Sequence, residues 1–433
     1  MTTLTSAIPA DLQHLVMTAE EAASLIQNGD TVAFNCFGPS GGPKAVPRAL
    51  AQTDTKIRFI GGASSSIDDL LVSNMISRTP YQQQPETRRA IANGDISFVE
   101  MHLAELTQQM RYMHIHPDFA VVEASYIGPY GIDPTSTVGS FYEFLELSDR
   151  IIVEYNEAQP NDKLREMMIS HYNTEALSKI VAIVITNEPD PERDTTIKDA
   201  VVGEYIGQNV IEFLDNEIVK GRLNRNLKPL EFGVGTITDA VARSMARGRF
   251  GSLTVRGEVL MDSIIDLYDA GNLGRATGTG LYLSDKYRER LFSDKMLRGR
   301  ITMLPVTETN DGAKIKLAET IAINGLIEVS LAGEGNSSFL NGSFYNGIGG
   351  SVEFAQNALI SIFVLPSTAK RGKISTIQPK LSHTDHIGPN VDVIVTEQGY
   401  ADLRRLNSRQ RALQLIKHCA HPDFKLELLE SVK

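Results

Sequence analysis

Two glutamates in the second half of the chain follow apolar runs that are typical of buried strands. Glu258 follows SLTVRG (252–257), and Glu397 follows VDVIVT (391–396). A carboxylate can act as a nucleophile or a general base, and ligands bind beyond the carboxyl ends of strands in open α/β sheets. A glutamate at a strand end also serves as a solvated residue or a helix cap. Position alone therefore leaves both roles open.

Glycine-rich turns are the second feature that could support chemistry. Three stand out, GPSGG (38–42), Gly233-Val234-Gly235 and NGIGG (346–350). None fits the P-loop pattern GxxxxGK[ST] or the dinucleotide fingerprint GxGxxG, so neither site is predicted. Glycine makes tight turns, and it also lets backbone N–H groups approach a developing oxyanion. The turn at 233–235 is the best placed for the second role, because a helical pattern follows it.

Histidines 383 and 386 in SHTDH are the remaining candidates for reactive groups. No cysteine lies near them and no third ligand is evident, so a structural turn is favoured over a metal site. No GxSxG elbow follows a strand, so a Ser-His-Asp hydrolase is not supported.

Short runs rich in Val and Ile must form the strands that position these residues. Runs of this kind are typical of strands buried on both faces of a parallel sheet, and they span residues 31–37, 119–126, 150–155, 179–186, 252–259, 320–331, 359–365 and 391–397. Helical patterns alternate with them at 19–29, 44–52, 236–248 and 408–419. The alternation predicts the α/β class.

The chain has 433 residues, a length that favours two domains. A glycine-rich turn followed by a helical pattern occurs in each half, at 38–52 and at 233–248. The stretch between the halves, residues 220–232, is polar and lacks periodicity. We therefore expect two related domains, residues 1–218 and residues 219–433.

Composition excludes several classes of protein. Acidic residues outnumber basic ones by 53 to 42, and no basic cluster is visible, so nucleic-acid binding is not expected. No stretch approaches the roughly 20 uncharged apolar residues of a membrane span. The two cysteines cannot make a disulfide framework, and the N-terminus lacks the pattern of a secretory signal. A cytoplasmic location is the simplest interpretation.

Several long segments resemble one enzyme family. In the second half these are AINGLIEVSLAGEGNSS (322–338), NGIGGSVEFAQNA (346–358), HTDHIGPNVDVIVTEQGYADLR (383–404) and AHPDF (420–424). The first half matches more loosely at 17–32, 43–51, 87–96 and 134–139. The chain resembles the acetyl-CoA hydrolase/transferase family, the class I CoA-transferases that act on succinate, acetate, butyrate, 4-hydroxybutyrate or itaconate.

The resemblance implies a fold and a reaction. It implies two similar open α/β domains of the CoA-transferase (NagB/RpiA-like) type, in a homodimer or a dimer of dimers. It also implies ping-pong transfer of CoA from an acyl-CoA to a small carboxylate through a glutamyl-CoA thioester, with no metal or redox cofactor. Acyl-CoA hydrolysis and non-catalytic binding of CoA are the alternatives.

The resemblance also implies roles for individual residues. Glu258 in TVRGEV resembles the nucleophile, and Glu397 resembles a second active-site glutamate. The backbone amides of Gly233, Val234 and Gly235 would face the reacting carbonyl, and Asn310 would hold the tetrahedral oxygen. Contacts to CoA are implied for Gly347, Gly350 and Lys370.

Departures from the family pattern bear on the substrate. Residues 156–177 are shorter than in the succinyl-CoA:acetate enzymes and lack their Arg-Ile-Gly segment. Lys380 and Arg405 stand where those relatives carry methionine and glycine. Added positive charge would favour a dicarboxylate acceptor such as succinate or itaconate. The alternative is that both side chains point to solvent.

Overall fold

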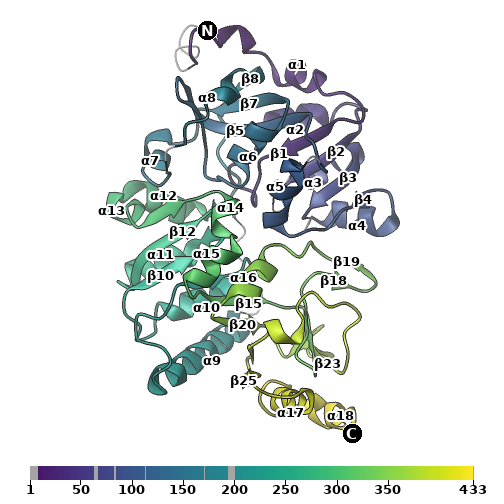
Figure 1. Ribbon diagram of the computed structural model, residues 1–433, viewed down its shortest axis with the longest axis vertical. Helices are drawn as coiled ribbons and strands as arrows, with labels where there is room; N and C mark the ends of the chain where they lie inside the picture. Colours follow the sequence, from purple (N-terminus) through teal and green to yellow (C-terminus); the bar gives the residue numbers. More distant parts are fainter. Residues whose placement is uncertain are drawn as a thin grey trace. The chain divides into compact units, whose positions relative to one another are not determined.

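The computed structural model describes residues 8–62, 67–81, 84–112, 114–169, 171–193 and 200–432. The chain divides into two units, each built from three segments. Unit 1 comprises Met1–Arg193, Gly278–Thr309 and Phe344–Gly349, and unit 2 comprises Asp194–Thr277, Asn310–Ser343 and Gly350–Lys433. Strands and helices alternate in both units (Figure 1), which confirms the α/β class.

The sheet of unit 1 is mostly parallel. Its strands are β1 (Thr31–Phe34), β2 (Ile57–Gly61), β3 (Met75–Pro80), β4 (Ser97–Phe98), β5 (Phe119–Gly128), β7 (Arg150–Asn156) and β8 (Ile180–Thr186). They lie in the order β4-β3-β2-β1-β5-β7-β8, and β6 (Gly131–Pro134) pairs antiparallel with β5. The first strand is central, because the chain adds strands on one side of β1 and then on the other.

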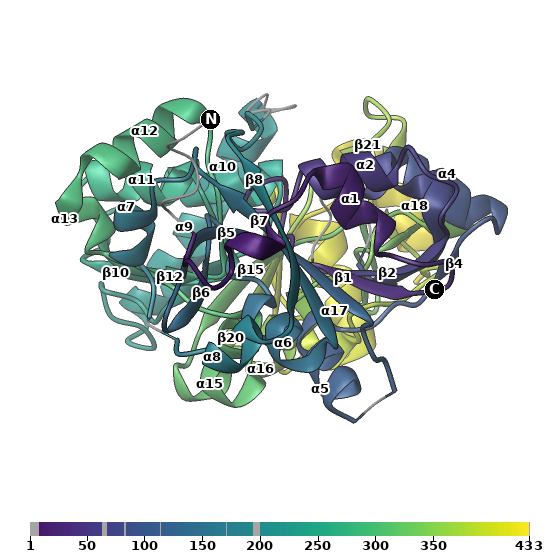
Figure 2. The same cartoon turned by 90° about the horizontal axis from the view of Figure 1, so that it is seen from above.

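Helices cover both faces of this sheet (Figure 2). Side chains alternate along a strand, so Val32 and Phe34 of β1 pack beneath α1 (Ala19–Ser24) and α2 (Ala45–Leu50). Ala33 faces the opposite cluster, which contains residues of α5 (Leu103–Arg111) and α6 (Phe141–Leu147). This double cover explains why the strand runs are nearly continuously apolar.

Shorter elements complete unit 1. They are η2 (Gln13–Leu15), α3 (Ile67–Leu70), η3 (Val72–Asn74), α4 (Pro85–Asn93), α7 (Asn161–Arg165), α8 (Thr174–Leu177), β13 (Gly280–Tyr282), α12 (Asp285–Ser293), α13 (Lys295–Arg298), β14 (Ile301–Met303) and α14 (Val306–Thr309).

The sheet of unit 2 follows the same plan. Its strands are β9 (Leu230–Phe232), β10 (Leu253–Arg256), β12 (Leu273–Gly278), β15 (Ile321–Gly325), β20 (Ile360–Val364), β24 (Val393–Thr396) and β25 (Gly399–Asp402). They lie in the order β12-β10-β9-β15-β20-β24-β25, with β25 antiparallel at the edge. The first strand is again central. The shared strand order supports the relation between the two halves that the turn-helix segments predict.

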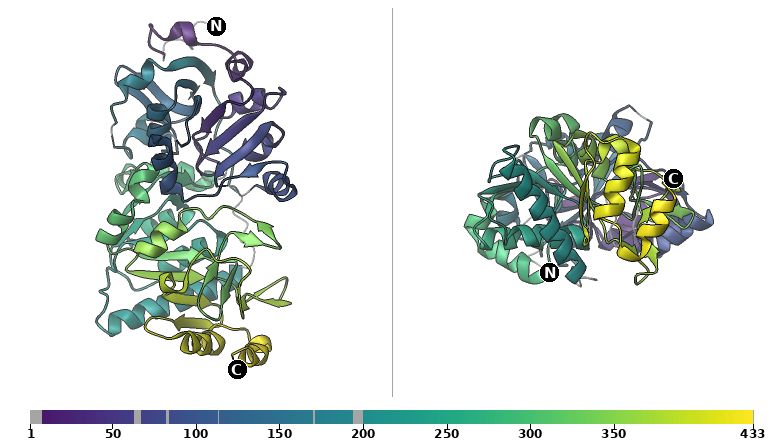
Figure 3. Two further views of the ribbon diagram at one scale, coloured as in Figure 1. Left: turned by 45° about the vertical axis from the view of Figure 1, so that its right-hand side comes forward. Right: turned by 90° about the horizontal axis from the view of Figure 1, so that it is seen from below.

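Helices α9 (Ala200–Val219) and α10 (Thr236–Met245) pack closely in unit 2 (Figure 1). Their contact needs small residues, since a Cβ on Gly203 would lie 2.8 Å from the Cβ of Ala240. Near the C-terminus, α17 (Ser408–His418) and α18 (Lys425–Glu430) lie side by side (Figure 3).

The remaining elements are short. They are β11 (Val259–Met261), α11 (Asp262–Asp269), α15 (Gly312–Leu317), β16 (Glu328–Ser330), β17 (Gly335–Asn336), β18 (Phe339–Leu340), β19 (Ser343–Phe344), α16 (Ser351–Asn357), β21 (Thr368–Ala369), β22 (Ile374–Ser375), β23 (Ile377–Gln378), η4 (Gly388–Asn390) and η5 (Pro422–Phe424).

The structure divides the chain at a different place from the expected boundary at 218/219. Helix α9 belongs to unit 2, because Asn209 donates to the backbone O of Thr396 at 2.8 Å and Asn216 donates to the hydroxyl of Tyr400 at 2.8 Å. The polar stretch 220–232 therefore lies inside unit 2, and its last three residues form β9. The return of residues 278–309 and 344–349 to unit 1 leaves no signal in composition or periodicity.

Candidate active site

The site in unit 2 is built around Glu258, which follows β10 and is partly buried. The Nδ2 of Asn310 donates a short hydrogen bond to Oε1 of Glu258. Asn310 is fully buried, and Asp311, the next residue, caps α15 by accepting from the backbone N–H of Lys314 at 2.9 Å. Asn310 therefore lies just before the start of α15, and its side-chain amide donates to the carboxylate of Glu258.

Gly350 completes this cluster from a third direction. It precedes α16, and a Cβ at this position would overlap Oε1 of Glu258 and the Nδ2 of Asn310. The backbone thus approaches the carboxylate more closely than any side chain permits. Glu258, Asn310 and Gly350 come together although 92 residues of sequence separate the first from the last.

The surroundings of Glu258 raise its pKa, so its protonated form persists to higher pH than in an ordinary glutamate. Burial and the negative charge of Glu353 raise its pKa from 4.5 to about 7, although the hydrogen bond from Asn310 opposes the shift. A carboxyl group with this pKa changes its charge near neutral pH. Such perturbed groups are frequent at functional sites.

The turn at Gly233–Gly235 lies beside this cluster. It follows β9, the neighbour of β10, so both segments leave the carboxyl edge of one sheet. Thr238 donates to the carbonyl oxygens of Gly233 and Gly235, which fixes the turn. Among the described residues, none accepts a backbone hydrogen bond from the N–H of Val234 or Gly235. These two amides can therefore serve a ligand.

Glu397 occupies another part of the same sheet edge. It follows β24 and accepts hydrogen bonds from the backbone N–H of Ser367, at 2.8 Å, and from its hydroxyl. Burial raises its pKa, but these hydrogen bonds outweigh burial and hold the pKa below its ordinary value. Strand β24 lies four places from β10, or about 19 Å at about 4.8 Å per strand. Glu397 is therefore an ionised residue on a distant strand of this sheet.

The residues predicted to contact CoA lie on different elements. Gly347 belongs to unit 1, where a Cβ would lie 2.7 Å from Cδ2 of Tyr81. Lys370 is exposed at the tip of the β21–β22 hairpin, in the left-handed region at φ 50°. Lys380 and Arg405 are also exposed. Their exposure supports the interpretation that both point to solvent.

Two buried polar residues near Glu258 escaped the sequence analysis. Glu231 of β9 is 2% exposed and accepts a hydrogen bond from Nδ2 of Asn324 on β15 at 2.7 Å. A glutamate inside the apolar run LEF, just before the 233–235 turn, was the available signal. Glu353 of α16, 8% exposed, is the third member of this acidic group.

The SHTDH segment forms a polar turn around Asp385. His383 donates to or accepts from Asp385 at 2.9 Å, and the hydroxyl of Ser338 donates to Asp385 at 2.7 Å. The ring of His386 is buried against Phe363, with 4.6 Å between ring centroids. Across the described ranges, no three His, Cys, Asp or Glu residues are grouped as metal ligands would be.

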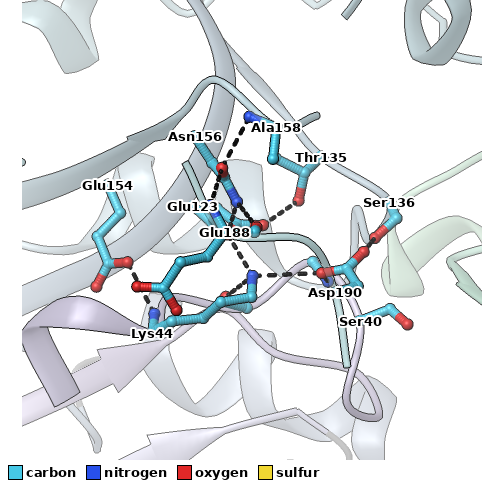
Figure 4. Close-up of polar contacts among 12 residues, drawn as sticks. Ser40, Lys44, Glu123, Thr135, Ser136, Glu154, Asn156, Ala158, Glu188 and Asp190 are labelled. Carbon is cyan, nitrogen blue, oxygen red and sulfur yellow. Dashed lines mark hydrogen bonds and ion pairs between the residues drawn. The ribbon is translucent and has the colours of Figure 1, made fainter. Parts of the chain in front are cut away.

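In unit 1, the turn at residues 38–42 is held by the protein's own charges (Figure 4). The ammonium of Lys44 binds Glu123 and lies 3.3 Å from Oδ1 of Asp190, which also accepts from the backbone N–H of Gly41 at 2.9 Å. Glu154 accepts from three backbone amides at the start of α2. We assign this network a structural role, because its donors are used within unit 1.

No helix in the described part of the chain has the length and apolar character needed to cross a membrane.

The chain matches one family along most of its length. Residues 9–188 match the acetyl-CoA hydrolase/transferase N-terminal domain, and residues 288–432 match the C-terminal domain. The sequence is 36% identical to succinyl-CoA:acetate CoA-transferase of Clostridium kluyveri, over 97% of this chain and 84% of the relative. Propanoyl-CoA:succinate CoA transferase of Escherichia coli is 36% identical, over 96% and 92%. Acetyl-CoA hydrolase of Saccharomyces cerevisiae is 33% identical, over 96% and 88%.

Solved structures share the fold. RipA from Yersinia pestis aligns with a TM-score of 0.76 at 22% identity, covering 96% of each chain. The 4-hydroxybutyrate CoA-transferase from Porphyromonas gingivalis aligns with a TM-score of 0.71 at 21% identity, covering 97% of each chain.

Proposed function

The chain belongs to the acetyl-CoA hydrolase/transferase family and is an enzyme, and we propose that it moves CoA between short-chain carboxylates through a thioester on Glu258. One observation carries the proposal: the carboxylate of Glu258 is bonded to the amide of Asn310 against a glycine that leaves no room for a side chain. This arrangement fixes the carboxylate and supplies a donor for the charge that develops.

The proposed reaction exchanges acyl groups in four balanced steps. The carboxylate of Glu258 attacks the acyl-CoA carbonyl, which forms a mixed anhydride and releases CoA thiolate. The thiolate attacks the glutamyl carbonyl, which leaves a glutamyl-CoA thioester and a free carboxylate. An incoming carboxylate attacks this thioester, which forms a second mixed anhydride and releases CoA thiolate. The thiolate attacks the acyl carbonyl of this anhydride, which forms the new acyl-CoA and frees the carboxylate of Glu258. Covalent catalysis thus divides one difficult exchange into easier steps.

Two kinds of oxyanion arise, and two sets of donors are available for them. One forms on the substrate carbonyl, where the amides of Val234 and Gly235 would donate. The other forms on the glutamyl carboxyl itself, whose Oε1 already accepts from Asn310. Loss of one such donor lowers kcat by about 10²- to 10³-fold in other enzymes.

The names of the relatives support a substrate class. Those with 36% identity are named for succinyl-CoA with acetate and for propanoyl-CoA with succinate, so we assign short-chain monocarboxylates and dicarboxylates. Butyrate, 4-hydroxybutyrate and itaconate remain within this class. If Lys380 favoured dicarboxylates, Lys380→Met would lower kcat/KM for succinate relative to acetate. The exposure of Lys380 leads us to expect no change in this ratio.

Intact-protein mass spectrometry tests the intermediate. The protein is incubated with acetyl-CoA or succinyl-CoA without a second carboxylate, and then digested. We expect a CoA-sized adduct on the peptide that contains Glu258, which should be missing from Glu258→Gln. The glutamine keeps an oxygen for Asn310 but cannot act as a nucleophile. An adduct elsewhere, or none with any of several short acyl-CoAs, would contradict the proposal.

Hydrolysis is the second candidate, because relatives with 30–34% identity are named acetyl-CoA hydrolase. Water would then attack the glutamyl thioester in place of a carboxylate. Release of CoA from acetyl-CoA, measured with and without added succinate, separates the two activities. A transferase needs succinate and makes succinyl-CoA, whereas a hydrolase releases free CoA at the same rate in both reactions.

The proposal includes assembly of the chain into a homodimer or a dimer of dimers. Size-exclusion chromatography with light scattering would give the mass in solution. A monomer at working concentrations would contradict this part alone.

A further inference from the structure

Glu231 is a carboxyl group inside the sheet of unit 2. It lies on β9, between Leu230 and Phe232, and only 2% of its surface is exposed. The neighbouring strand β15 supplies its partner, because Ala322 pairs with Glu231 and side chains two residues apart share a face. The partner is Asn324, 4% exposed, whose Nδ2 donates to Oε2 of Glu231 at 2.7 Å.

The other end of the Asn324 amide lies under the 233–235 turn. A Cβ on Gly233 would overlap Oδ1 of Asn324, so the turn rests directly on this side chain. The backbone N–H of Gly233 donates to the carbonyl of Ile323 at 2.9 Å, which ties the turn to the same strand. Asn324 therefore connects Glu231 to the backbone that carries the amides of Val234 and Gly235.

The charge state of Glu231 follows from its surroundings. Burial, together with the charge of Glu258, raises its pKa well above the ordinary value, and the donors Asn324 and the Ile323 backbone oppose this. On the other neighbouring strand, β10, the charged residue is Arg256, which follows the Val255 that pairs with Leu230. The raised pKa favours the neutral carboxylic acid form of Glu231.

We propose that Glu231 is a positioning residue for CoA transfer, which acts through Asn324 to fix the turn whose amides face the substrate carbonyl. The inference rests on the proposed function, since it assigns a task to that same turn. Glu231 touches no reacting atom in this scheme. Its carboxyl group supplies shape and an acceptor for Asn324, and an ionised general base at this position is the competing interpretation.

Glu231→Gln and Glu231→Ala separate these roles. Glutamine keeps the length, neutrality and acceptor oxygen, so we expect kcat within about threefold of the parent enzyme. Alanine removes the support of Asn324, and a misplacement of about 1 Å can lower the rate about 100-fold. We expect kcat to fall by this amount while KM for acyl-CoA changes less than threefold, because the turn would act on the transition state.

The pH dependence of kcat/KM tests the charge of Glu231, because loss of packing alone would not shift it. A neutral Glu231 adds no charge beside Glu258. In Glu231→Gln, the rise of kcat/KM on the acid side of the profile (the acid limb) should therefore occur at the same pH as in the parent enzyme. Glu353→Gln is the matched control, because removal of the Glu353 charge should move this limb to lower pH. A shift of the limb in Glu231→Gln like that in Glu353→Gln would overturn the inference.

A second variant covers the case in which Glu231→Ala fails to fold. Asn324→Ser shortens the connecting side chain. It should reduce kcat as much as Glu231→Ala does, and the acid limb of its kcat/KM profile should stay at the same pH. Unchanged kcat in Glu231→Ala or in Asn324→Ser would overturn the inference. The mass assay distinguishes this result from failure of the proposed function, because the parent enzyme would still form the adduct on Glu258.

Discussion

The amide of Asn310 donates to the carboxylate of Glu258, 52 residues earlier in the chain. This bond lowers the pKa of Glu258, whereas burial and Glu353 raise it. These opposing effects place the midpoint of the titration of Glu258 near neutral pH. The same amide is in place for the oxyanion that forms when the glutamyl carbonyl is attacked.

Gly350→Ala should abolish most activity without unfolding the protein. The new methyl group would overlap Oε1 of Glu258 and displace both the carboxylate and Asn310. We expect kcat to fall at least about 100-fold, because misplaced reacting groups are costly at this scale. Gly325→Ala is the matched control in the same unit, since a Cβ there meets nothing within 4 Å. Equal activity in the two variants would contradict the geometry of the site.

The pH dependence of kcat/KM should follow the ionisation of Glu258. Its raised pKa of about 7 means that the neutral acid predominates below this pH, and the nucleophilic carboxylate predominates above it. Activity should therefore rise through pH 7 and reach a plateau. Glu353→Gln removes a repulsive charge and should move this rise to lower pH, whereas the exposed Glu430→Gln should not. A rise centred near pH 4.5 in the parent enzyme would contradict the assigned environment.

Glu258→Gln should stabilise the protein above neutral pH. Because the pKa of Glu258 is higher in the folded state than in the unfolded state, its ionisation favours unfolding as pH rises from 4.5 to 7. The variant lacks this penalty, which we expect to be about 1–3 kcal/mol at pH 8. Urea unfolding of both proteins at pH 5 and pH 8 measures it. The difference should be small at pH 5, and a larger difference at pH 5 than at pH 8 would reverse the sign.

Lys44→Met should destabilise unit 1 far more than Arg48→Met. The Lys44 ammonium opposes the rise in the pKa of buried Glu123, which burial takes to about 7. Removal of Lys44 leaves Glu123 and Asp190 without their cation, at an expected cost of about 3–5 kcal/mol. Arg48 pairs with Glu188 in solvent, where the expected loss is about 0–1 kcal/mol. Denaturant midpoints of the two variants provide the comparison, and similar midpoints would contradict the structural role of the network.

The strands that support the site were predictable because they are buried on both faces. Runs such as 150–155 and 391–397 are mostly apolar and correspond to β7 and β24. The run 320–331 contains two strands, β15 and β16, which lie in different sheets. Apolar content does not show where a chain leaves one sheet for another.

The approach of Asn310 and Gly350 to Glu258 could not be derived from spacing. The resemblance to a known family implied that Asn310 holds the tetrahedral oxygen and that Gly350 contacts CoA, but it did not reveal that both residues touch Glu258. Glu231 was missed because its three-residue strand ends the polar stretch 220–232, which the sequence assigns to the region between the two halves. Only the register of β9 against β15 shows that it faces Asn324.

The discontinuity of unit 1 affects the order in which the protein can fold during its synthesis. Its last segment, Phe344–Gly349, belongs to a chain of 433 residues. Domains usually fold as units while the ribosome extends the chain. Here the strands of the N-terminal sheet lie within residues 31–186, but unit 1 is not complete until most of the polypeptide has emerged. A nascent chain stalled before residue 344 would therefore expose surface that the finished molecule covers, and chaperones would have the opportunity to bind it.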